Sequence, residues 1–320
     1  MPKPLFLSID RLPDPVRAQL PDLVEFVEVD PSSLDAALEA RGGEVRLISS
    51  RGKHRIDGAL LDRLPSLGLI AGYGVGYDKI DAQAAVQRDV MVTHTPDVLN
   101  ADVADLAVAL LLATLRQLPQ ADRFVREGRW REGSYPLTAT LRDRTIGLVG
   151  MGRIGRAIAR RLAAFDLEIA YHTRNPVEGL SYTYVDSLVA LARQVDALVV
   201  IVPGGASTEG LIGGEVLKAL GEQGVLVNVS RGTVVDQDAL VAALTDGTIL
   251  AAGLDVFRDE PAVPEGLLAL NNVVLLPHIG SGTIHTRAAM DRLYLDNITA
   301  WLAHRPVLTP VPECRVKEPL

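Results

Sequence analysis

Cysteine is almost absent from this sequence, because Cys314 is the only one among 320 residues. No disulfide can form within the chain, and no cluster of cysteines can hold a metal ion. The histidines other than His278 show no spacing typical of metal ligands. We therefore expect a protein without a bound metal, located in the reducing environment of the cytoplasm.

Long apolar runs and an excess of positive charge are also missing. The stretch Leu106–Leu115 is half of the roughly 20 residues that a membrane span needs, and the apolar N-terminal stretch ends too early for a signal peptide. With 32 basic and 40 acidic residues, the net charge of −8 disfavours binding to nucleic acid or anionic membranes. The sequence predicts a soluble protein with neither as a partner.

The chain has enough apolar sequence for two folded domains. Hydrophobic residues make up 48% of it and charged residues 22%, over about twice the length of an average domain. In the first third, short β-rich runs alternate with helical patterns, which predicts a parallel sheet with helices on both faces. We expect strands at Leu5–Ile9, Val45–Ser49, Leu67–Ala71 and Val90–Thr93.

The same rhythm restarts after a long apolar helix predicted over residues 100–118. Six further strands predict a complete doubly wound sheet of the Rossmann type. They are expected at 145–149, 168–172, 197–202, 225–229, 251–256 and 273–276. We predict an α/β protein with a discontinuous flavodoxin-like substrate domain, residues 1–99 and 288–320, a nucleotide-binding domain, residues 100–287, and a substrate cleft between them.

The sequence Gly-Met-Gly-Arg-Ile-Gly, which begins at Gly150, has the spacing of a dinucleotide-binding fingerprint. It follows a predicted strand and opens a predicted helix, which is the context that the motif requires. Gly150 permits the tight turn, Gly152 lets the backbone approach the pyrophosphate, and Gly155 lets the helix pack on the strand. Arg153 and Ile154 are expected to contact the dinucleotide as well.

The strand after the fingerprint ends without the acidic residue that binds the ribose 2′-hydroxyl in NAD-specific sites. Thr173 stands near that position, and Arg174 and Asn175 follow it. Hydroxyl and guanidinium groups are donors suited to a 2′-phosphate, so NADP(H) is favoured as the cofactor and NAD(H) stays possible. The alternative is that Arg174 points into solvent and pairs with Glu178.

Three side chains in the last third of the chain supply the groups needed to reduce a 2-keto acid beside a nicotinamide. A ketone that accepts hydride needs a proton donor that titrates near working pH, and the imidazole of His278 is the candidate. Glu260 is expected to hydrogen-bond to it, and Arg231 to bind the substrate carboxylate or polarise the carbonyl. Each residue alone also fits a structural role. All three, however, follow predicted strands, where open α/β sheets bind ligands.

A second glycine-rich stretch, Gly-Tyr-Gly-Val-Gly-Tyr-Asp, runs from Gly72 to Asp78. It lacks a third glycine at the offset of a dinucleotide loop. Such a run exposes consecutive N–H groups, which suit a carboxylate as well as a phosphate. The alternative is a turn that only needs positive φ angles.

Taken together, these motifs resemble those of the D-isomer-specific 2-hydroxyacid dehydrogenase family from about Gly74 to Arg287. The shared pieces are Gly74-Val-Gly-x-Asp, Thr95-Pro, Val103-Ala-Asp, the glycine fingerprint, Val229-Ser-Arg-Gly, Gly253-Leu-Asp-Val, Asp259-Glu-Pro and Pro277-His-Ile-Gly-Ser. The resemblance implies the catalytic roles described above for Arg231, Glu260 and His278. It also implies a homodimer that pairs through the nucleotide-binding domains.

The same resemblance implies further site residues. Val75 and Gly76 would bind the substrate carboxylate together with Arg231 and His278. Asp255 and Gly280 would lie near the nicotinamide, as would His278. Other cofactor contacts are expected at Val202, Pro203, Thr208, Val229 and Ser230.

Within the family, the segment Tyr-His-Thr-Arg-Asn resembles the NADPH-dependent glyoxylate/hydroxypyruvate and hydroxyphenylpyruvate reductases, which implies glyoxylate, hydroxypyruvate or an arylpyruvate as substrate. Trp130, Tyr73 and Tyr77 are expected to bear on substrate size, although core or interface packing is the favoured explanation for Trp130. Three residues depart from the family pattern: Asp105 replaces a usual Glu, Asp166 a common glycine and Gly282 a usual alanine.

Two other functions stay open. An NAD-linked dehydrogenase of the same family would oxidise D-3-phosphoglycerate or formate, but Glu260 stands where formate dehydrogenases carry Gln. A dinucleotide-sensing binding protein would share the fold without the reaction. Normal nucleotide binding without turnover of any keto acid would favour that second alternative.

Overall fold

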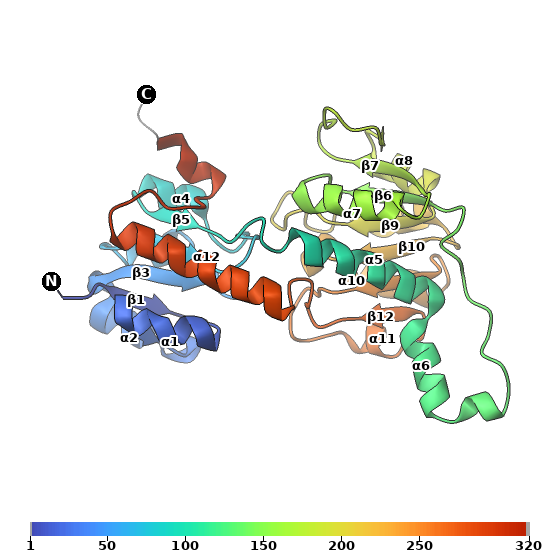
Figure 1. Ribbon diagram of the computed structural model, residues 1–320, viewed down its shortest axis with the longest axis horizontal. Helices are drawn as coiled ribbons and strands as arrows, with labels where there is room; N and C mark the ends of the chain where they lie inside the picture. The colour runs from blue at the N-terminus through green and yellow to red at the C-terminus, as the bar shows by residue number, and fades with distance from the viewer. Residues whose placement is uncertain (1, 318–320) are drawn as a thin grey trace. The chain divides into compact units, whose positions relative to one another are not determined.

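The computed structural model describes residues 2–317, which fold into two units with one parallel sheet each (Figure 1). The first unit comprises the chain up to Leu99 and again from Ile284, and the second unit runs from Asn100 to Thr283. The predicted α/β class with two doubly wound parallel sheets is confirmed. The predicted return at residue 288 lies inside helix α12 (Ile284–Leu302), all of which belongs to the first unit.

The sheet of the first unit has the order β2-β1-β3-β4-β5, and all its strand pairs are parallel. Its strands are β1 (Leu5–Ser8), β2 (Glu25–Glu28), β3 (Val45–Ser50), β4 (Leu69–Gly72) and β5 (Met91–Thr93). Its helices are α1 (Asp14–Leu23), α2 (Leu34–Arg41), α3 (Gly58–Asp62), α4 (Ala82–Gln87) and α12. The sequence analysis missed β2, because this edge strand reads Glu-Phe-Val-Glu and exposes both glutamates.

Helix α12 is part of the core of the first unit. It packs against β4 and α1. Tyr294, on this helix, is fully buried, and its ring meets that of Tyr73 edge to face at 5.6 Å. The ring of Trp301 lies so close to the chain before β4 that a Cβ added at Gly68 would come within 2.5 Å of it. Helix α12 therefore supplies part of the hydrophobic core of the first unit, together with strands β1 to β5 from the start of the chain.

The sheet of the second unit has seven parallel strands in the order β12-β11-β10-β9-β6-β7-β8. They are β6 (Thr145–Val149), β7 (Glu168–His172), β8 (Thr183–Tyr184), β9 (Ala197–Val200), β10 (Val225–Asn228), β11 (Ala251–Leu254) and β12 (Val273–Leu275). The sequence analysis predicted six of them. The seventh, β8, has only two residues at the edge of the sheet, which is too short for an apolar pattern.

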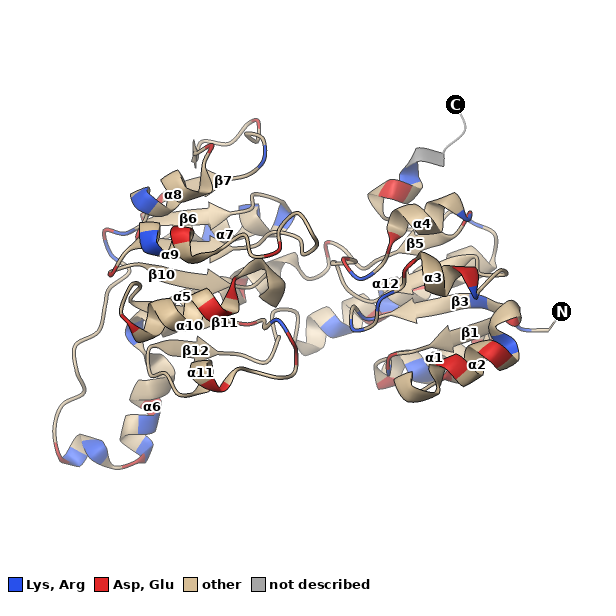
Figure 2. Ribbon diagram, turned by 180° about the vertical axis from the view of Figure 1, so that it is seen from behind, with Lys and Arg blue, Asp and Glu red and all other residues tan. Residues whose placement is uncertain are grey.

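Helices cover both faces of this second sheet. They are α5 (Asn100–Arg116), α6 (Leu118–Arg126), α7 (Arg153–Ala163), α8 (Leu188–Gln194), α9 (Gly214–Leu220), α10 (Gln237–Thr245) and α11 (Glu265–Leu268). Helices α5 and α7 pack together on the face seen in Figure 1, and α9 packs with α8 and α10 on the face seen in Figure 2. The helix predicted over residues 100–118 is α5, which ends at Arg116 because Gln117 is left-handed with φ 50°, and α6 begins at Leu118.

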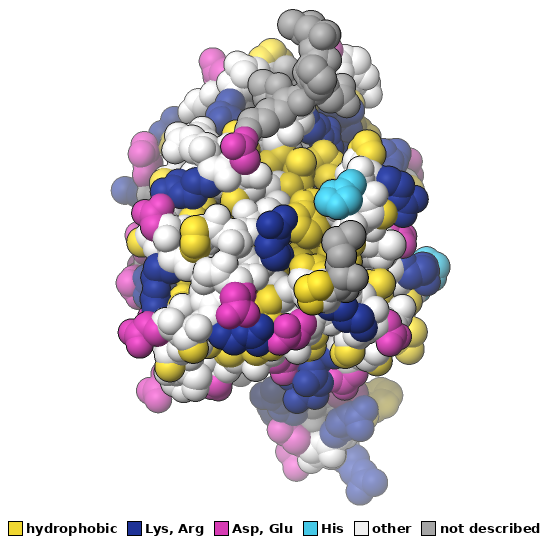
Figure 3. All heavy atoms as spheres, turned by 90° about the vertical axis from the view of Figure 1, so that its left-hand side faces the viewer, with side chains coloured by type: hydrophobic (Ala, Val, Ile, Leu, Met, Phe, Trp, Pro, Cys, Tyr) yellow, Lys and Arg dark blue, Asp and Glu magenta, His cyan; other side chains and the backbone are white. Residues whose placement is uncertain are grey.

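The surface carries both signs of charge. Acidic and basic residues are scattered over the helices and loops of both units (Figure 2). On the face of the first unit shown in Figure 3, they surround an apolar area without forming a continuous patch of either sign. No helix within residues 2–317 is both long enough and apolar enough to cross a membrane.

Candidate active site

The three predicted catalytic residues follow neighbouring strands of the second unit. Arg231 comes after β10, Glu260 after β11 and His278 after β12. The three strands are adjacent and parallel, with Asn228 opposite Leu254 and Leu254 opposite Leu275. Their carboxyl ends therefore meet at one edge of the sheet, which brings the three loops together.

Glu260 and His278 form a direct pair. Nδ1 of His278 lies 2.7 Å from Oε2 of Glu260, and the other carboxylate oxygen accepts a 3.0 Å hydrogen bond from the N–H of Phe257. Partial burial would raise the pKa of Glu260, but the hydrogen bonds from His278 and Phe257 and the nearby charge of Arg231 outweigh it and hold this pKa below the ordinary 4.5. Because Nδ1 is engaged, Nε2 is the ring nitrogen left to exchange a proton with a ligand.

A buried carboxylate fixes the turn that carries His278. The backbone of His278 is left-handed, with φ 53°. Its N–H donates to the carbonyl of Asp255 at 2.9 Å, and the N–H groups of Ile279 and Gly280 donate to the two carboxylate oxygens of Asp255, both at 2.8 Å. Burial raises the pKa of Asp255, and these two backbone donors oppose that shift. The sequence analysis placed Asp255 near the nicotinamide and did not foresee this bracing role.

The loop that carries Arg231 is braced from inside the sheet. Asn228 is almost fully buried, and its side-chain oxygen accepts from the N–H and the hydroxyl of Ser230 at 3.0 and 2.7 Å, while its amide donates to the carbonyl of Arg231 at 2.9 Å. A Cβ added at Gly232 would lie only 1.8 Å from the carbonyl carbon of Phe257. The loop after β10 is therefore pressed against the loop that holds Glu260.

The glycine fingerprint has the local geometry that dinucleotide binding requires. Gly150 has φ 107°, and a Cβ there would lie 2.4 Å from the carbonyl oxygen of Ile201. A Cβ at Gly155 would lie 2.3 Å from the carbonyl oxygen of Gly150. At Gly152, by contrast, an added Cβ would meet no atom within 4 Å. The fold itself requires the outer two glycines, whereas Gly152 leaves open space, as expected if a pyrophosphate passes there.

The start of α7 leaves donors for that ligand. Gly152 is the N-cap of this helix and provides no side-chain cap, and the first turn, which includes Arg153 and Ile154, has no acidic residue. N–H groups in a first turn have no partner within the helix and favour an anion. The residues present therefore fit a dinucleotide.

The predicted ribose end lies just beyond β7. The hydroxyl of Thr173 donates to the carbonyl of Asn175 at 2.6 Å, which makes a tight turn. Arg174 and Asn175 are exposed. Within residues 2–317, Arg174 makes no ion pair with Glu178, so the ion pair considered as an alternative does not form.

The remaining predicted cofactor residues also follow strand ends of the second unit. Val202 and Pro203 come after β9, and the hydroxyl of Thr208 donates to the carbonyl of Pro203 at 2.7 Å. Val229 and Ser230 come after β10. The strand order reverses between β6 and β9, so the fingerprint and these loops flank the switch point where such sheets bind ligands.

The predicted carboxylate-binding residues Val75 and Gly76 lie in the first unit, after β4. The carbonyl of Val75 lies 3.0 Å from Nδ1 of His94, and the N–H of Gly74 donates to the hydroxyl of Thr95 at 3.0 Å. Gly74 has φ 144°, a conformation suited to glycine.

The aromatic residues expected to bear on substrate size have other partners. Tyr73 is buried and donates to Asp291 at 2.7 Å, and Tyr77 donates to Glu313 at 3.2 Å. Trp130 is 69% exposed, which excludes packing in the core of its own chain. Within the described residues, no group of histidines, cysteines and acids could hold a metal ion.

The three departures from the family pattern have local explanations. Asp105 pairs with Arg161 and so links α5 to α7. Asp166 is left-handed with φ 60°, a conformation that glycine adopts more readily. A Cβ added at Gly282 would come within 2.9 Å of the carbonyl oxygen of Ile279, so glycine fits the turn after His278 better than alanine.

Known proteins share this architecture. Residues 108–280 match the model for the NAD binding domain of D-isomer specific 2-hydroxyacid dehydrogenase. The chain is 45% identical to hydroxyphenylpyruvate reductase of Plectranthus scutellarioides, over 86% of this chain and 87% of the relative. It is 43% identical to a glyoxylate/hydroxypyruvate reductase of Arabidopsis thaliana, over 86% and 88%. The crystal structure of an NADPH-dependent glyoxylate/hydroxypyruvate reductase from Sinorhizobium meliloti, in complex with NADP and malonate, matches with a TM-score of 0.92 at 50% identity over 97% of both chains.

Replacing Asp255 by Asn should loosen the turn that carries His278. The amide keeps one acceptor oxygen but sets its NH₂ group against a backbone N–H, so one of the two carboxylate contacts is lost. Amide hydrogen exchange in the peptide covering residues 276–282, followed by mass spectrometry, should accelerate about 5- to 30-fold. Asp259→Asn, an exposed acid beside Arg258, is the control. Unchanged exchange in Asp255→Asn would contradict the bracing role.

Proposed function

The chain belongs to the D-isomer-specific 2-hydroxyacid dehydrogenase family, and from this we propose that it reduces a small 2-keto acid to the D-2-hydroxy acid with NADPH. Glyoxylate, hydroxypyruvate and arylpyruvates are the candidate substrates, because the relatives described above carry these activities in their names. The observation that carries the proposal is the Glu260–His278 pair at the strand edge that also holds Arg231.

In this reaction His278 is the acid. Its Nδ1 is held by Glu260, so Nε2 donates the proton to the carbonyl oxygen as negative charge develops there. Arg231 orients the substrate through its carboxylate or polarises the carbonyl. When bound, NADPH supplies the hydride that adds to the carbonyl carbon. Val75 and Gly76 in the first unit offer backbone N–H groups to the substrate carboxylate.

We assign the cofactor to the second unit, which runs from Asn100 to Thr283. The fingerprint loop and the start of α7 would hold the pyrophosphate, since Gly152 leaves open space and the first turn of the helix has no acidic residue. Thr173, Arg174 and Asn175 would hold the 2′-phosphate, which favours NADPH over NADH. The substrate would be bound mainly by the first unit, which comprises the chain up to Leu99 and again from Ile284. The NADP-bound structure of the Sinorhizobium relative supports this preference.

Replacing Glu260 by Gln should lower kcat/KM for keto-acid reduction about 100-fold or more, because the charge that pairs with His278 is removed. The pKa of Glu260 is lowered in the folded chain, so the pair is intact above the ordinary carboxyl pKa of 4.5 and is lost only as pH falls through the lowered value. The defect should therefore persist down to about pH 5.5.

Initial rates of NADPH oxidation with glyoxylate and hydroxypyruvate between about pH 5.5 and 8 measure this effect. Glu265→Gln, an exposed glutamate at the start of α11, is the matched control and should leave the rate unchanged. His278→Ala should abolish turnover. A fully active His278→Ala variant would remove the catalytic assignment.

Replacing Arg174 by Ala should raise the KM for NADPH about 10- to 100-fold, the effect expected for losing a charged hydrogen bond. The KM for NADH should hardly change, because NADH has no 2′-phosphate. Arg193→Ala, an exposed arginine at the end of α8, is the control. A wild-type preference for NADH, or an unchanged KM for NADPH in Arg174→Ala, would overturn the cofactor assignment.

We also propose a homodimer that pairs through the second unit. Helix α6 and the segment after it expose several large apolar side chains, which is typical of an interaction surface. These are Leu118, Val125, Trp130 and Leu137, and Leu137 has no neighbour that covers it. Sedimentation velocity should give twice the mass of the single chain, and Trp130→Glu combined with Leu137→Glu should give a monomer. A wild-type monomer at micromolar concentration would refute this proposal.

A cytoplasmic location is proposed on the chemistry of the single cysteine. Cys314 is a buried free thiol, which suits a reducing compartment. Fractionation of the source cells with an antibody against the chain would test this location. Recovery outside the cytoplasmic fraction would disprove it.

A further inference from the structure

The loop that follows β3 in the first unit is rich in positive charge. Arg51, Lys53 and Arg55 lie within five residues directly after the last residue of the strand, Ser50. None of the three side chains forms an ion pair with any residue of the described chain. Several other arginines of this unit do have acidic partners, for example Arg17 with Glu28 and Arg88 with Asp62. The positive charge of this loop is therefore not balanced within the unit.

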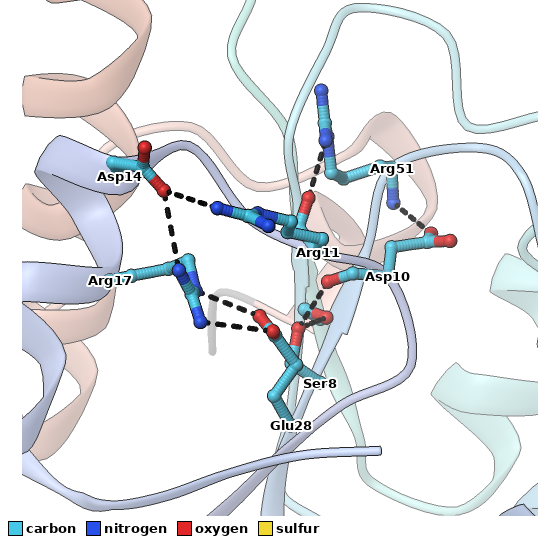
Figure 4. A network of polar contacts seen from close by, with 8 residues as sticks. Ser8, Asp10, Arg11, Asp14, Arg17, Glu28 and Arg51 are labelled. Atoms are coloured by element: carbon cyan, nitrogen blue, oxygen red, sulfur yellow. Dashed lines mark hydrogen bonds and ion pairs between the residues drawn. The ribbon is translucent and has the colours of Figure 1, made fainter. Parts of the chain in front are cut away.

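Arg51 differs from the other two because it is partly buried and held in place. Its backbone N–H donates to Oδ2 of Asp10 at 3.1 Å, and Nη1 of its guanidinium group donates to the carbonyl of Arg11. Its Cζ lies 5.6 Å from the ring centre of Tyr73. Figure 4 shows the guanidinium group pointing away from the Asp10 carboxylate, towards this carbonyl. A carbonyl and a ring face orient the guanidinium but do not neutralise it.

The carboxylate of Asp10, beside this loop, is already engaged. Asp10 is buried, its Oδ1 lies 2.7 Å from Nδ1 of His54, and its Oδ2 accepts from the backbone of Arg51. The ring under the guanidinium is fixed as well, since Tyr73 donates to Asp291 and packs on Tyr294. The guanidinium group of Arg51 is thus held in one orientation before any ligand binds, which lowers the entropy cost of binding.

The position of Arg51 in the fold is one where sheets of this kind bind ligands. The strand order reverses between β1 and β3, and Asp10 and Arg51 follow these two strands. In open parallel sheets, ligands bind outside the carboxyl ends at such a switch point. The next strand, β4, pairs with β3 and leads into Val75 and Gly76, the proposed carboxylate-binding residues. Arg51 and these N–H groups therefore leave the sheet from adjacent strand ends.

We propose that Arg51 binds a second carboxylate on the substrate, so that the chain acts on 2-keto acids with an anionic tail. This inference rests on the proposed function, which supplies the keto group and the first carboxylate. A guanidinium fork matches the planar carboxylate with two parallel hydrogen bonds, and Lys53 and Arg55 add positive charge that attracts a dianion. A second carboxylate on the substrate would balance the charge of the partly buried Arg51, whose side chain has no acidic partner among the described residues.

The test compares two keto acids of equal chain length, 2-ketoglutarate with a charged tail and 2-ketopentanoate with an uncharged one. The ratio of their kcat/KM values should fall roughly 10- to 100-fold in Arg51→Met, because a charged hydrogen bond is lost. Arg51→Lys should give an intermediate ratio, since the charge stays but the fork is lost. In the wild type, the ratio should also fall as salt is raised from about 0.05 to 0.5 M, and it should fall less in Arg51→Met, where only Lys53 and Arg55 still attract the dianion.

Arg46→Met is the matched control. Arg46 lies near the start of β3, the strand that Arg51 follows, and its Cζ is 5.8 Å from the ring centre of Trp301. Arg46 is thus an arginine that contacts an aromatic ring, as Arg51 does, but it does not lie at the carboxyl end of the strand. The Arg46→Met ratio should equal that of the wild type. An unchanged ratio in Arg51→Met, or an equal fall in Arg46→Met, would overturn the proposal.

Failure of the proposed function would look different. In that case the wild type would oxidise NADPH with neither glyoxylate nor hydroxypyruvate, whatever the state of Arg51. Calorimetric titration with glutarate, a dicarboxylate that cannot be reduced, then decides on Arg51 alone. Binding that is weakened in Arg51→Met and kept in Arg46→Met would support the second-carboxylate site, and equal binding by all three proteins would refute it.

Discussion

The candidate active site depends on one buried carboxylate. Asp255 takes two backbone N–H groups on its side-chain oxygens and a third on its carbonyl, and these three bonds define the left-handed turn at His278. Ionising a buried acid is costly, and the backbone donors offset that cost. The direction of the His278 ring, and with it the contact to Glu260, follows from this turn. A residue that need not touch substrate thus sets the geometry of one that does.

The charges of the site are arranged by contacts between loops. One carboxylate oxygen of Glu260 accepts from the N–H of Phe257, and the other contacts the imidazole of His278. Gly232 lets the loop of Arg231 press on the carbonyl of Phe257, so three loops from three adjacent strands support one another. A cation, a carboxylate and an imidazole are then held without a metal ligand set among the described residues. Such preorganised charge is the main means by which a protein stabilises an oxyanion.

Local rules explain how far the sequence could predict this molecule. The fingerprint glycines and the apolar central strands follow from short-range sterics and hydrophobicity, and so does the placement of Arg231, Glu260 and His278 after strands. Strands β2 and β8 were missed, because edge strands need no apolar run. The bracing by Asp255 and the hydrogen bond from Tyr73 to Asp291 join residues 24 or more positions apart. Such contacts depend on side-chain directions that only the folded chain defines.

Because the chain returns to the first unit only at Ile284, the ribosome makes the two parts of this unit at different times, before and after the second unit. Strands β1 to β5 leave the ribosome before the whole second unit, and the helix that buries Tyr294 and covers Gly68 with Trp301 emerges only after that unit. The second unit, being continuous in sequence, can close its own core while the first still exposes apolar surface. During that interval strands β1 to β5, which are made before the helix that covers them, are the part most in need of a chaperone.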